Sequence, residues 1–271
     1  MSKNISKINS LAIGSFDGIH LAHRELIKNA DMVLVIERGS GYLTPGYKRS
    51  LYCDKPMTFY IFDKIAHLTP SEFVSKLKSD FPDLKKIVVG YDFRFGIDKS
   101  GDANTLKEIF DADTLIIDEF KLDNIPIHSR IIKKYIQDQN IKLANKMLGR
   151  KYRIDGKVIQ GQGLGGKELV PTLNLKTEDY LLPHGVYATK TKIGDVWFDS
   201  ISFIGHRVST DGSFAIESHI LDQNIGKVNG DIWIEFVDFI RSNQKFDSIA
   251  SLKEQIDIDI TQAKRILSNE G

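Results

Sequence analysis

Apolar and polar positions in the first half of the chain follow two alternating periods. Short apolar runs predict buried strands, and the segments between them carry apolar residues three and four positions apart, as amphipathic helices do. The expected strands are residues 9–16, 33–37, 85–93 and 113–120, and the expected helices are residues 21–32, 71–81 and 102–112. Ser71, after Pro70, is the expected N-cap of the second helix. Strands separated by helices predict a parallel sheet with ligands at the carboxyl ends of its strands.

The pattern changes after a predicted pair of helices over residues 128–139 and 141–149, which ends at Gly149. From Tyr152 onward, short alternating segments separated by glycines predict an antiparallel barrel or sandwich. These segments are residues 152–161, 168–175, 185–194, 195–205, 213–221 and 231–240, and a final helix is expected over residues 248–267. We therefore expect two domains, residues 1–142 and 143–271.

The composition of the chain bears on whether it binds nucleic acid, enters a membrane or forms disulfides. The 271 residues are 41% hydrophobic and 27% charged, with a net charge of +1. This allows two ordinary cores but gives no basic excess of the kind that nucleic-acid binding requires. No segment approaches about 18 consecutive apolar residues and no secretory signal is visible, so we expect no membrane span and a cytoplasmic location. Cys53 is the only cysteine, which excludes an internal disulfide and favours an inert thiol.

The segment GSFDGIHLAH, residues 14–23, ends the first predicted strand and begins the first helix. Gly14 and Gly18 allow a sharp turn and a close approach to a ligand, and the free N–H groups of a helix start favour phosphate. His20 and His23 lie on one face of the first turn, where they can stabilise charge on a phosphoryl group in transfer. An HxxH pair alone is weak, because most such pairs are a surface histidine beside a packed one, and zinc needs a third ligand.

A second candidate site follows the strand over residues 85–93. In the segment IVVGYDFRFGIDKSGD, Asp92, Phe93 and Phe95 place a carboxylate and two aromatic rings at the end of that strand. They could line a pocket at the carboxyl edge of the sheet. The two phenylalanines could equally pack against the sheet.

In the barrel half, Thr172 and Asn174 are two residues apart and therefore share one face of a strand. A hydroxyl and an amide oxygen are hard ligands that suit Mg²⁺ carrying nucleotide phosphates. Glu217 shares a strand face with His219 and could accept a proton from a substrate hydroxyl. A solvated strand face would explain the same spacing.

The glycine-rich segment before Thr172 matches GxGxxG at Gly161, Gly163 and Gly166. The dinucleotide-binding motif must begin a helix, whereas this segment leads into ELVPTLNL, which alternates like a strand. A glycine-rich flap over phosphates is the favoured interpretation.

These motifs together resemble two known families. GSFDGIHLAH is similar to the GxFDGxHxGH signature of the HxGH nucleotidyltransferases in their flavin-adenylating form, and residues 87–102 are similar to that family's VGxDFxFGxxxxGD motif. Residues 144–175, LPHGVYA, AIESHIL and residues 240–259 resemble, in order, the riboflavin kinase domain. The two resemblances cover nearly the whole chain, in the order found in bacterial bifunctional riboflavin kinase/FMN adenylyltransferases.

The resemblance implies a Rossmann-like nucleotidyltransferase sheet, followed by a riboflavin-kinase-type antiparallel barrel with a terminal helix. It implies phosphorylation of riboflavin to FMN by ATP, and adenylylation of FMN to FAD by a second ATP with release of pyrophosphate. The implied catalytic residues are His20, His23 and Glu217. In the first domain, ATP would bind Gly14, Phe16, Asp17, His20, His23, Ser129 and Lys133, and flavin would bind Asp92, Phe93 and Phe95. In the barrel, ATP would bind Gly161, Gly163, Lys167, Thr172 and Asn174, the last two with Mg²⁺, and Arg241 would lie near the flavin.

The chain departs from these families at four places. Ala22 replaces the glycine of HxGH, residues 38–46 replace a TFxPxP segment, HSRIIK at residues 128–133 replaces SSTxIR, and Gly166 stands where an arginine is usual. Three of the four departures lie on the adenylyltransferase or nucleotide side, and lysine lacks the bidentate fork of arginine. We therefore expect both activities, with adenylylation slow or tuned to other conditions. Three alternatives stay open: only the riboflavin kinase activity is robust; the chain is a flavin-responsive binding module; or the first half adenylylates another substrate, which leaves the barrel unexplained.

Overall fold

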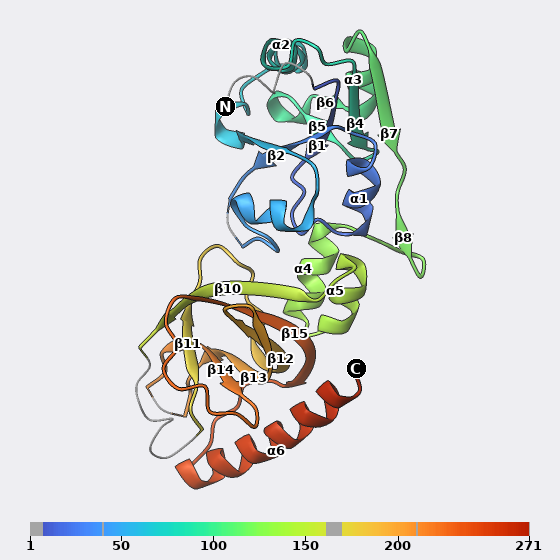
Figure 1. The fold of residues 1–271 in the computed structure, drawn as a ribbon. Coiled ribbons are helices and arrows are strands. Elements are labelled where there is room, and N and C mark those ends of the chain that lie inside the picture. Colours follow the sequence, from blue (N-terminus) through green and yellow to red (C-terminus); the bar gives the residue numbers. More distant parts are fainter. Residues whose placement is uncertain (1–7, 40, 161–169, 210, 271) are drawn as a thin grey trace. The chain divides into compact units, whose positions relative to one another are not determined.

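The computed structural model describes residues 8–39, 41–160, 170–209 and 211–270 (Figure 1). The chain divides into two compact units, Met1–Ile131 and Ile132–Gly271. The functional division between residues 142 and 143 stays a prediction.

The first unit is built on a parallel sheet with strand order β3-β2-β1-β4-β7. Its strands are β1 (Ser10–Gly14), β2 (Met32–Glu37), β3 (Met57–Ile61), β4 (Lys86–Gly90) and β7 (Asp113–Ile117). The sequence predicts four of these five strands. It misses β3, a short edge strand whose residues are half-buried or exposed and whose apolar run is interrupted by Thr58.

Shorter elements connect these strands. Two hairpin-like pairs join β5 (Arg94–Phe95) to β6 (Gly101–Asp102) and β8 (Lys121–Leu122) to β9 (Ile125–Pro126). The 3₁₀ turns that the described residues form here are η2 (Gly46–Tyr52), η3 (Phe62–Lys64) and η4 (Ile97–Lys99).

Three helices accompany the sheet: α1 (Leu21–Ile27), α2 (Pro70–Asp80) and α3 (Ala103–Ile109). The predicted N-cap of α2, Ser71, is wrong. Thr69 caps this helix through a reciprocal pair, in which its hydroxyl accepts from the Glu72 amide while the Glu72 carboxylate accepts from the Thr69 amide. Pro70 is then the first helical residue, where its missing N–H costs nothing.

Both faces of the sheet are buried in separate apolar clusters. On one face Leu11, Ile13 and Leu34 pack with residues of α2 and α3, among them Phe73 and Leu106. On the other face Ala12, Val33 and Val35 pack with Phe16, Ile19 and the Leu26 side chain of α1. Sheets buried on both sides require continuously apolar strands, which is why periodicity identified these strands well.

The second unit begins with α4 (Ser129–Gln137), whose first turn lies before the division, and α5 (Ile141–Leu148). Gly149 ends α5 in the left-handed conformation, with φ of 66°, as predicted. The rest is a closed antiparallel barrel with strand order β10-β11-β14-β13-β12-β15. Its strands are β10 (Tyr152–Ile159), β11 (Leu173–Lys176), β12 (Gly185–Ile193), β13 (Val196–His206), β14 (Phe214–Ile220) and β15 (Asp231–Arg241).

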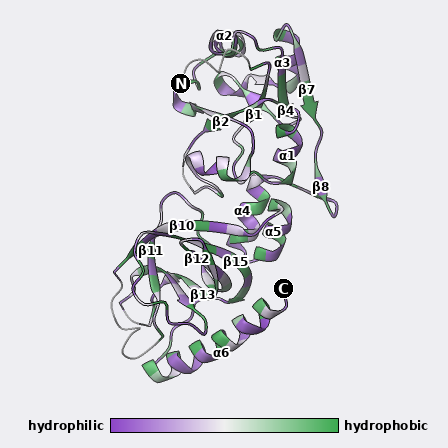
Figure 2. Cartoon of the chain, viewed as in Figure 1, coloured by the Kyte–Doolittle hydropathy of each residue, from purple (hydrophilic) through white to green (hydrophobic). Residues whose placement is uncertain are grey.

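The terminal helix α6 (Ile249–Ser268) packs against the barrel. Hydrophobic and hydrophilic residues alternate along it (Figure 2). Ala263 and Leu267 are buried against Val186 and Val237 of the barrel strands. The predicted parallel sheet, antiparallel barrel and terminal helix are therefore confirmed.

Part of the barrel interior is hydroxylated rather than apolar. Thr189 and Thr191 of β12 share hydrogen bonds of 2.7–2.9 Å with Ser200, Ser202 and Ser218 of the neighbouring strands. All five side chains are buried. We call this network the hydroxyl ladder; because every hydroxyl has a partner, its burial is not penalised.

In the part of the chain that the structure describes, each helix is too short or too polar to cross a bilayer.

Candidate active sites

The loop between β1 and α1 has a backbone conformation that side chains rarely adopt. Phe16, Gly18 and Ile19 have φ angles of 47°, 90° and 41°. For Phe16 and the β-branched Ile19 this is strained, and the strain persists because both side chains are fully buried in the apolar cluster beneath the loop. The loop delivers the chain to His20 in an extended conformation, so that this residue becomes the N-cap of α1.

The two predicted catalytic histidines lie together. The Nδ1 atom of His20 accepts a hydrogen bond of 3.3 Å from the His23 amide, and the two rings stack at 3.5 Å between centroids with 16° between their planes. Because Nδ1 of His20 is an acceptor, the neutral ring carries its proton on Nε2. His20 is buried, with 2% of its surface exposed, and donation of this proton to a phosphate oxygen stays a prediction. The edge of the Phe16 ring fixes His23 from another side, at 5.1 Å.

Two of the predicted ATP-binding residues brace this loop. The buried carboxylate of Asp17 accepts the amide of Thr44 at 3.0 Å, and the Ser129 hydroxyl donates to the Asp17 carbonyl at 2.7 Å. The predicted ATP contact Gly14 lies beneath Phe16, where an added Cβ would meet the ring at 3.4 Å. Lys133, the remaining predicted contact, lies in the second unit.

The segment that replaces the family's TFxPxP motif is held by a buried arginine that the sequence analysis missed. Arg49 is fully buried, and its Nη1 lies 2.6 Å from Glu37 at the end of β2 and 3.1 Å from the Gly46 carbonyl. Its guanidinium also lies over the Tyr42 ring. Burial, together with the neighbouring Glu37 carboxylate, raises the pKa of Tyr42 to about 12. No periodicity marks such a residue, because its partner is distant in the sequence.

The predicted flavin residues divide into a buried and an exposed part. Phe95 is buried in the core against Phe73, at 5.3 Å between ring centroids, while Phe93 stacks on Phe95 at 5.5 Å. This placement favours the packing role for Phe95. Asp92 is mostly exposed and lies 3.7 Å from Nδ1 of His128. Contact with flavin stays a prediction for all three residues.

Beside Asp92 lies a titratable cluster that the sequence analysis did not single out. The Tyr91 hydroxyl donates to Glu119 at 2.8 Å and lies 3.2 Å from Nε2 of His128. Burial and the Glu119 carboxylate raise the pKa of Tyr91 to about 12, and hydrogen bonds from Lys121 and Tyr91 lower the pKa of Glu119. Tyr91 and Glu119 follow β4 and β7, so both lie at the carboxyl edge of the sheet. The occurrence of titratable residues just after two strands was the feature of the sequence that could have predicted this cluster.

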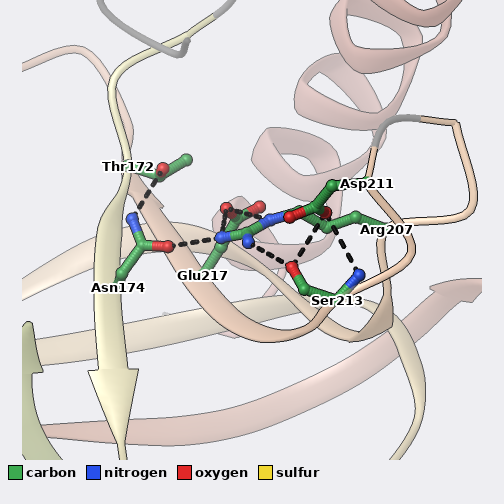
Figure 3. Close-up of polar contacts among 6 residues, drawn as sticks. All are labelled: Thr172, Asn174, Arg207, Asp211, Ser213 and Glu217. Atoms are coloured by element: carbon green, nitrogen blue, oxygen red, sulfur yellow. Dashed lines mark hydrogen bonds and ion pairs between the residues drawn. The ribbon is translucent and has the colours of Figure 1, made fainter. Parts of the chain in front are cut away.

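In the barrel, the structure brings together the three residues that the sequence predicted to cooperate (Figure 3). Asn174 of β11 and Glu217 of β14 are directly paired across the two strands and share a face. Thr172 lies just before β11, with its hydroxyl 3.4 Å from the Asn174 Nδ2 atom. A hydroxyl, an amide and a carboxylate therefore lie within one small patch.

Arg207 joins this patch and was missed by the sequence analysis. Its Nη2 atom donates to Glu217 Oε1 and to Asn174 Oδ1, both at 2.7 Å, and its Nε atom donates to Glu217 at 3.1 Å. Its Nη1 atom donates to the Ser213 hydroxyl at 2.9 Å, which in turn donates to Asp211 at 2.8 Å (Figure 3). Arg207 lies in the turn between β13 and β14, so only the folded turn brings it to Asn174.

The other predicted barrel residues are not part of this patch in the described structure. Arg241 is bound to the buried carboxylate of Asp259 in α6, through Nε at 2.8 and 3.0 Å and through Nη2 at 2.8 Å. This gives it a structural role in holding α6 to the barrel, and its proximity to flavin stays a prediction. Gly161, Gly163 and Lys167 lie outside the described residues.

The donor set of the barrel patch fits a magnesium ion that arrives with a nucleotide. The oxygens of Thr172 and Asn174 are hard but neutral, so a divalent ion would need further oxygens from phosphates and water, which is how Mg²⁺ is commonly held in kinases. Among the described residues no group of three or more His, Cys, Asp or Glu side chains could hold a metal.

Comparison with known proteins agrees with this geometry. The family model described as FAD synthetase matches residues 53–131, and the one described as riboflavin kinase matches residues 148–267. A bifunctional riboflavin kinase/FMN adenylyltransferase of Buchnera aphidicola subsp. Acyrthosiphon pisum is 32% identical over 95% of this chain and 94% of its own. Proteins of the same name from Haemophilus influenzae and Escherichia coli K12 are 27% and 28% identical, covering 96% and 94% of this chain and 94% and 91% of their own.

One solved structure resembles nearly the whole chain. A protein from Streptococcus pneumoniae, described as a macrolide-efflux protein, superimposes with a TM-score of 0.82 and 26% identity, over 97% of each chain. The arrangement of a parallel sheet followed by a closed barrel therefore exists in an experimentally determined protein.

A histidine pair at a strand-to-helix junction in one unit, and a carboxylate beside a hydroxyl and an amide oxygen in the other, fit a nucleotide-dependent transferase with two modules. The 32% identity over 95% of the chain is close enough to assign the family. The chain belongs to the bifunctional riboflavin kinase/FMN adenylyltransferases.

Proposed function

We propose that this chain phosphorylates riboflavin to FMN in the barrel and adenylylates FMN to FAD in the first unit, using one ATP for each step. The observation that carries the proposal is the pairing of Asn174 with Glu217 across β11 and β14. Two modules in one chain, each matching a family model, support both steps. ATP, riboflavin, FMN and FAD are then its substrates and products, and the cytoplasmic location remains a prediction.

In the barrel, Glu217 acts as the base for the terminal ribityl hydroxyl of riboflavin. The hydroxyl oxygen forms a bond to the γ-phosphorus of ATP, the bond from that phosphorus to ADP breaks, and the hydroxyl proton passes to the carboxylate. The side chain of Glu217 is 23% exposed, so a substrate hydroxyl can reach it from the surface. Bonds from Arg207 restrict the carboxylate to one orientation.

Thr172 and Asn174 are the residues proposed to hold Mg²⁺. Bound there, the ion would offset the negative charge of the ATP phosphates. The protein's part is to supply two fixed oxygens from one strand edge. That edge is itself held in place, since Nδ1 of His219 lies 2.7 Å from the Pro171 carbonyl.

In the first unit, a phosphate oxygen of FMN attacks the α-phosphorus of ATP and pyrophosphate leaves. No covalent enzyme intermediate is needed, so the protein contributes positioning and electrostatic stabilisation. His20 donates through Nε2, because Nδ1 is occupied by the His23 amide. Ser129 and Asp17 hold the loop that orients this pair.

Separate substitutions test the two steps. The purified chain is incubated with riboflavin, ATP and Mg²⁺, and the products are separated by chromatography. Glu217→Gln is expected to slow FMN formation by about 10²–10⁴-fold, the usual contribution of a general base, while the conversion of added FMN to FAD persists. His23→Ala is expected to do the reverse.

Glu235→Gln is the matched control, because Glu235 also pairs with an arginine in the barrel, at Arg153, away from Asn174. Full FMN formation by Glu217→Gln would refute the role of the base. Production of FMN without any FAD by the unaltered chain would instead establish that only the riboflavin kinase activity is robust.

A further inference from the structure

We infer that Arg207 is a positioning residue of the barrel site, because it hydrogen-bonds both the base Glu217 and the amide oxygen of Asn174 that is proposed to bind the metal. When a nucleotide binds with Mg²⁺, the hydrogen bond between Arg207 and Asn174 must break. The inference rests on the proposed function of the barrel. The motifs quoted in the sequence analysis do not include Arg207, which lies in the turn between β13 and β14.

Arg207 forms charge-assisted hydrogen bonds to both Glu217 and Asn174. One nitrogen of Arg207, Nη2, donates to both Glu217 Oε1 and Asn174 Oδ1 at 2.7 Å. Bonds of this kind, in which the donor is charged, are roughly twice as strong as neutral ones. The side chains of Arg207 and Glu217 are only 16% and 23% exposed, so water competes weakly with this pair.

The turn that carries Arg207 is fixed independently of the site. The Arg207 amide donates to the Ser213 carbonyl at 2.9 Å, and the Gly212 amide donates back to the Arg207 carbonyl at 3.1 Å. The Ser213 hydroxyl, which accepts from Nη1, is itself held by Asp211. The guanidinium therefore reaches Asn174 and Glu217 from a residue whose backbone and side chain are both hydrogen-bonded to Gly212 and Ser213.

The same contacts bear on the orientation of the Asn174 amide. A guanidinium has donors and no acceptor, so it is the amide oxygen, Oδ1, that faces Arg207. The amide nitrogen then faces the Thr172 hydroxyl, at 3.4 Å. A metal ion held by Thr172 Oγ1 together with Asn174 Oδ1 needs the opposite orientation, with the oxygen on the Thr172 side.

Arg207 and Mg²⁺ therefore compete for the same oxygen atom. To bind the metal, the Asn174 amide turns over and its bond to Nη2 breaks, while Nε and Nη2 of Arg207 keep their bonds to Glu217. The positive guanidinium also repels a divalent cation close by. Arg207 accordingly lowers the affinity of the barrel for the metal and nucleotide, and in return it holds the base in the orientation needed for proton transfer.

The test separates these two effects by measuring binding and rate independently. Arg207→Met is expected to tighten binding of ADP with Mg²⁺ to the barrel about tenfold, equivalent to about 1.4 kcal/mol, and to lower kcat for FMN formation about tenfold or more. Binding is measured by titration calorimetry on the full chain. The chain with Thr172→Ala and Asn174→Ala gives the baseline, because the first unit is proposed to bind nucleotide as well.

A merely structural role for Arg207 would weaken binding and not tighten it, so the direction of the change is diagnostic. Arg207→Lys, which keeps one charge but reaches fewer acceptors, is expected to tighten binding by a smaller factor and to recover part of kcat. Arg153→Met, which removes another barrel arginine paired with a glutamate, is the matched control and should change neither quantity.

Equal or weaker binding in both Arg207 variants overturns the inference, and a weaker one would assign the guanidinium to the phosphates of the nucleotide. Such a result, with FMN still produced by the unaltered chain, leaves the proposed function standing. If the unaltered chain gives the same heat as the baseline variant and produces no FMN, the proposed function itself fails.

Discussion

Replacing Arg241 should destabilise the barrel more than replacing its partner Asp259. In the structure, Nε of Arg241 at the end of β15 donates hydrogen bonds of 2.8 and 3.0 Å to the Asp259 carboxylate on α6, and Nη2 forms an ion pair with it at 2.8 Å. The Asp259 carboxylate also accepts from Gln255 at 2.9 Å. The two side chains differ in burial, with 19% of Arg241 exposed against 4% of Asp259.

This difference in burial determines how much stability each substitution removes. Removing one partner of a buried pair costs about 3–5 kcal/mol, because the other charge stays buried without compensation. Arg241→Met leaves the nearly inaccessible carboxylate with only the Gln255 amide, so the full range of about 3–5 kcal/mol applies. Asp259→Ala leaves a guanidinium that can still reach water, so we expect about half of that cost, roughly 2 kcal/mol.

The assay is denaturant unfolding followed by tryptophan fluorescence. The chain has two tryptophans, Trp197 and Trp233, and both lie in barrel strands, so their emission reports on the second unit. Lys264→Met is the matched control, because Lys264 also lies on α6 and pairs with Asp222, but both side chains are largely exposed. Exposed pairs contribute about 0–1 kcal/mol, so this variant should unfold almost as the parent does.

Equal costs for Arg241→Met and Asp259→Ala would refute the argument from burial. A cost below about 1 kcal/mol for Arg241→Met would place the pair in the weak, solvated class and remove its role in anchoring α6.

Two further predictions concern single positions. Gly156→Ala should destabilise the barrel by about 1–3 kcal/mol in the same unfolding assay, because its new Cβ would lie 2.6 Å from the Lys176 carbonyl of β11, the strand that carries Asn174. FMN formation should fall while conversion of FMN to FAD is retained, and equal loss of both would contradict this. Burial raises the pKa of the Cys53 thiol, so less thiolate is present at pH 7 and iodoacetamide should alkylate the folded chain several-fold more slowly than the denatured chain, as followed by mass spectrometry.

The sequence predicted those features that depend on periodicity. Strict alternation predicted that Thr172 and Asn174 share one strand face and that Glu217 shares another with His219. The direct pairing of Asn174 with Glu217 is seen only in the folded barrel. The sequence could not find Arg207, since the contact of that side chain with Asn174 depends on the conformation of a turn and on strand pairing across the barrel. Local alternation carries no information about which strands become neighbours.

The errors in local structure have similar causes. Ser71 is a good capping residue, but Thr69 is the N-cap of α2 and forms a capping box with Glu72. The choice between the two residues depends on whether Pro70 lies before the helix or is its first residue. The apolar spacing after Leu21 suggested a helix to residue 32, whereas α1 ends at Ile27 so that the chain can turn into β2. In the first unit, the aromatic ring of Phe95 is buried in the core, and sequence alone could not distinguish that from a ligand contact.

The hydroxyl ladder has a consequence for the surface of the barrel. Ser218 is buried and bonded to Thr191, and its neighbour Glu217 must therefore point outward, toward Asn174. If β14 slipped by one residue, Ser218 would leave its partner and a carboxylate would enter an interior where the described barrel residues include no buried lysine or arginine, at a cost of several kcal/mol. The interior serines and threonines thus fix the register of β14. Hydrogen bonds inside the barrel thereby determine which side chain of this strand faces outward for proton transfer.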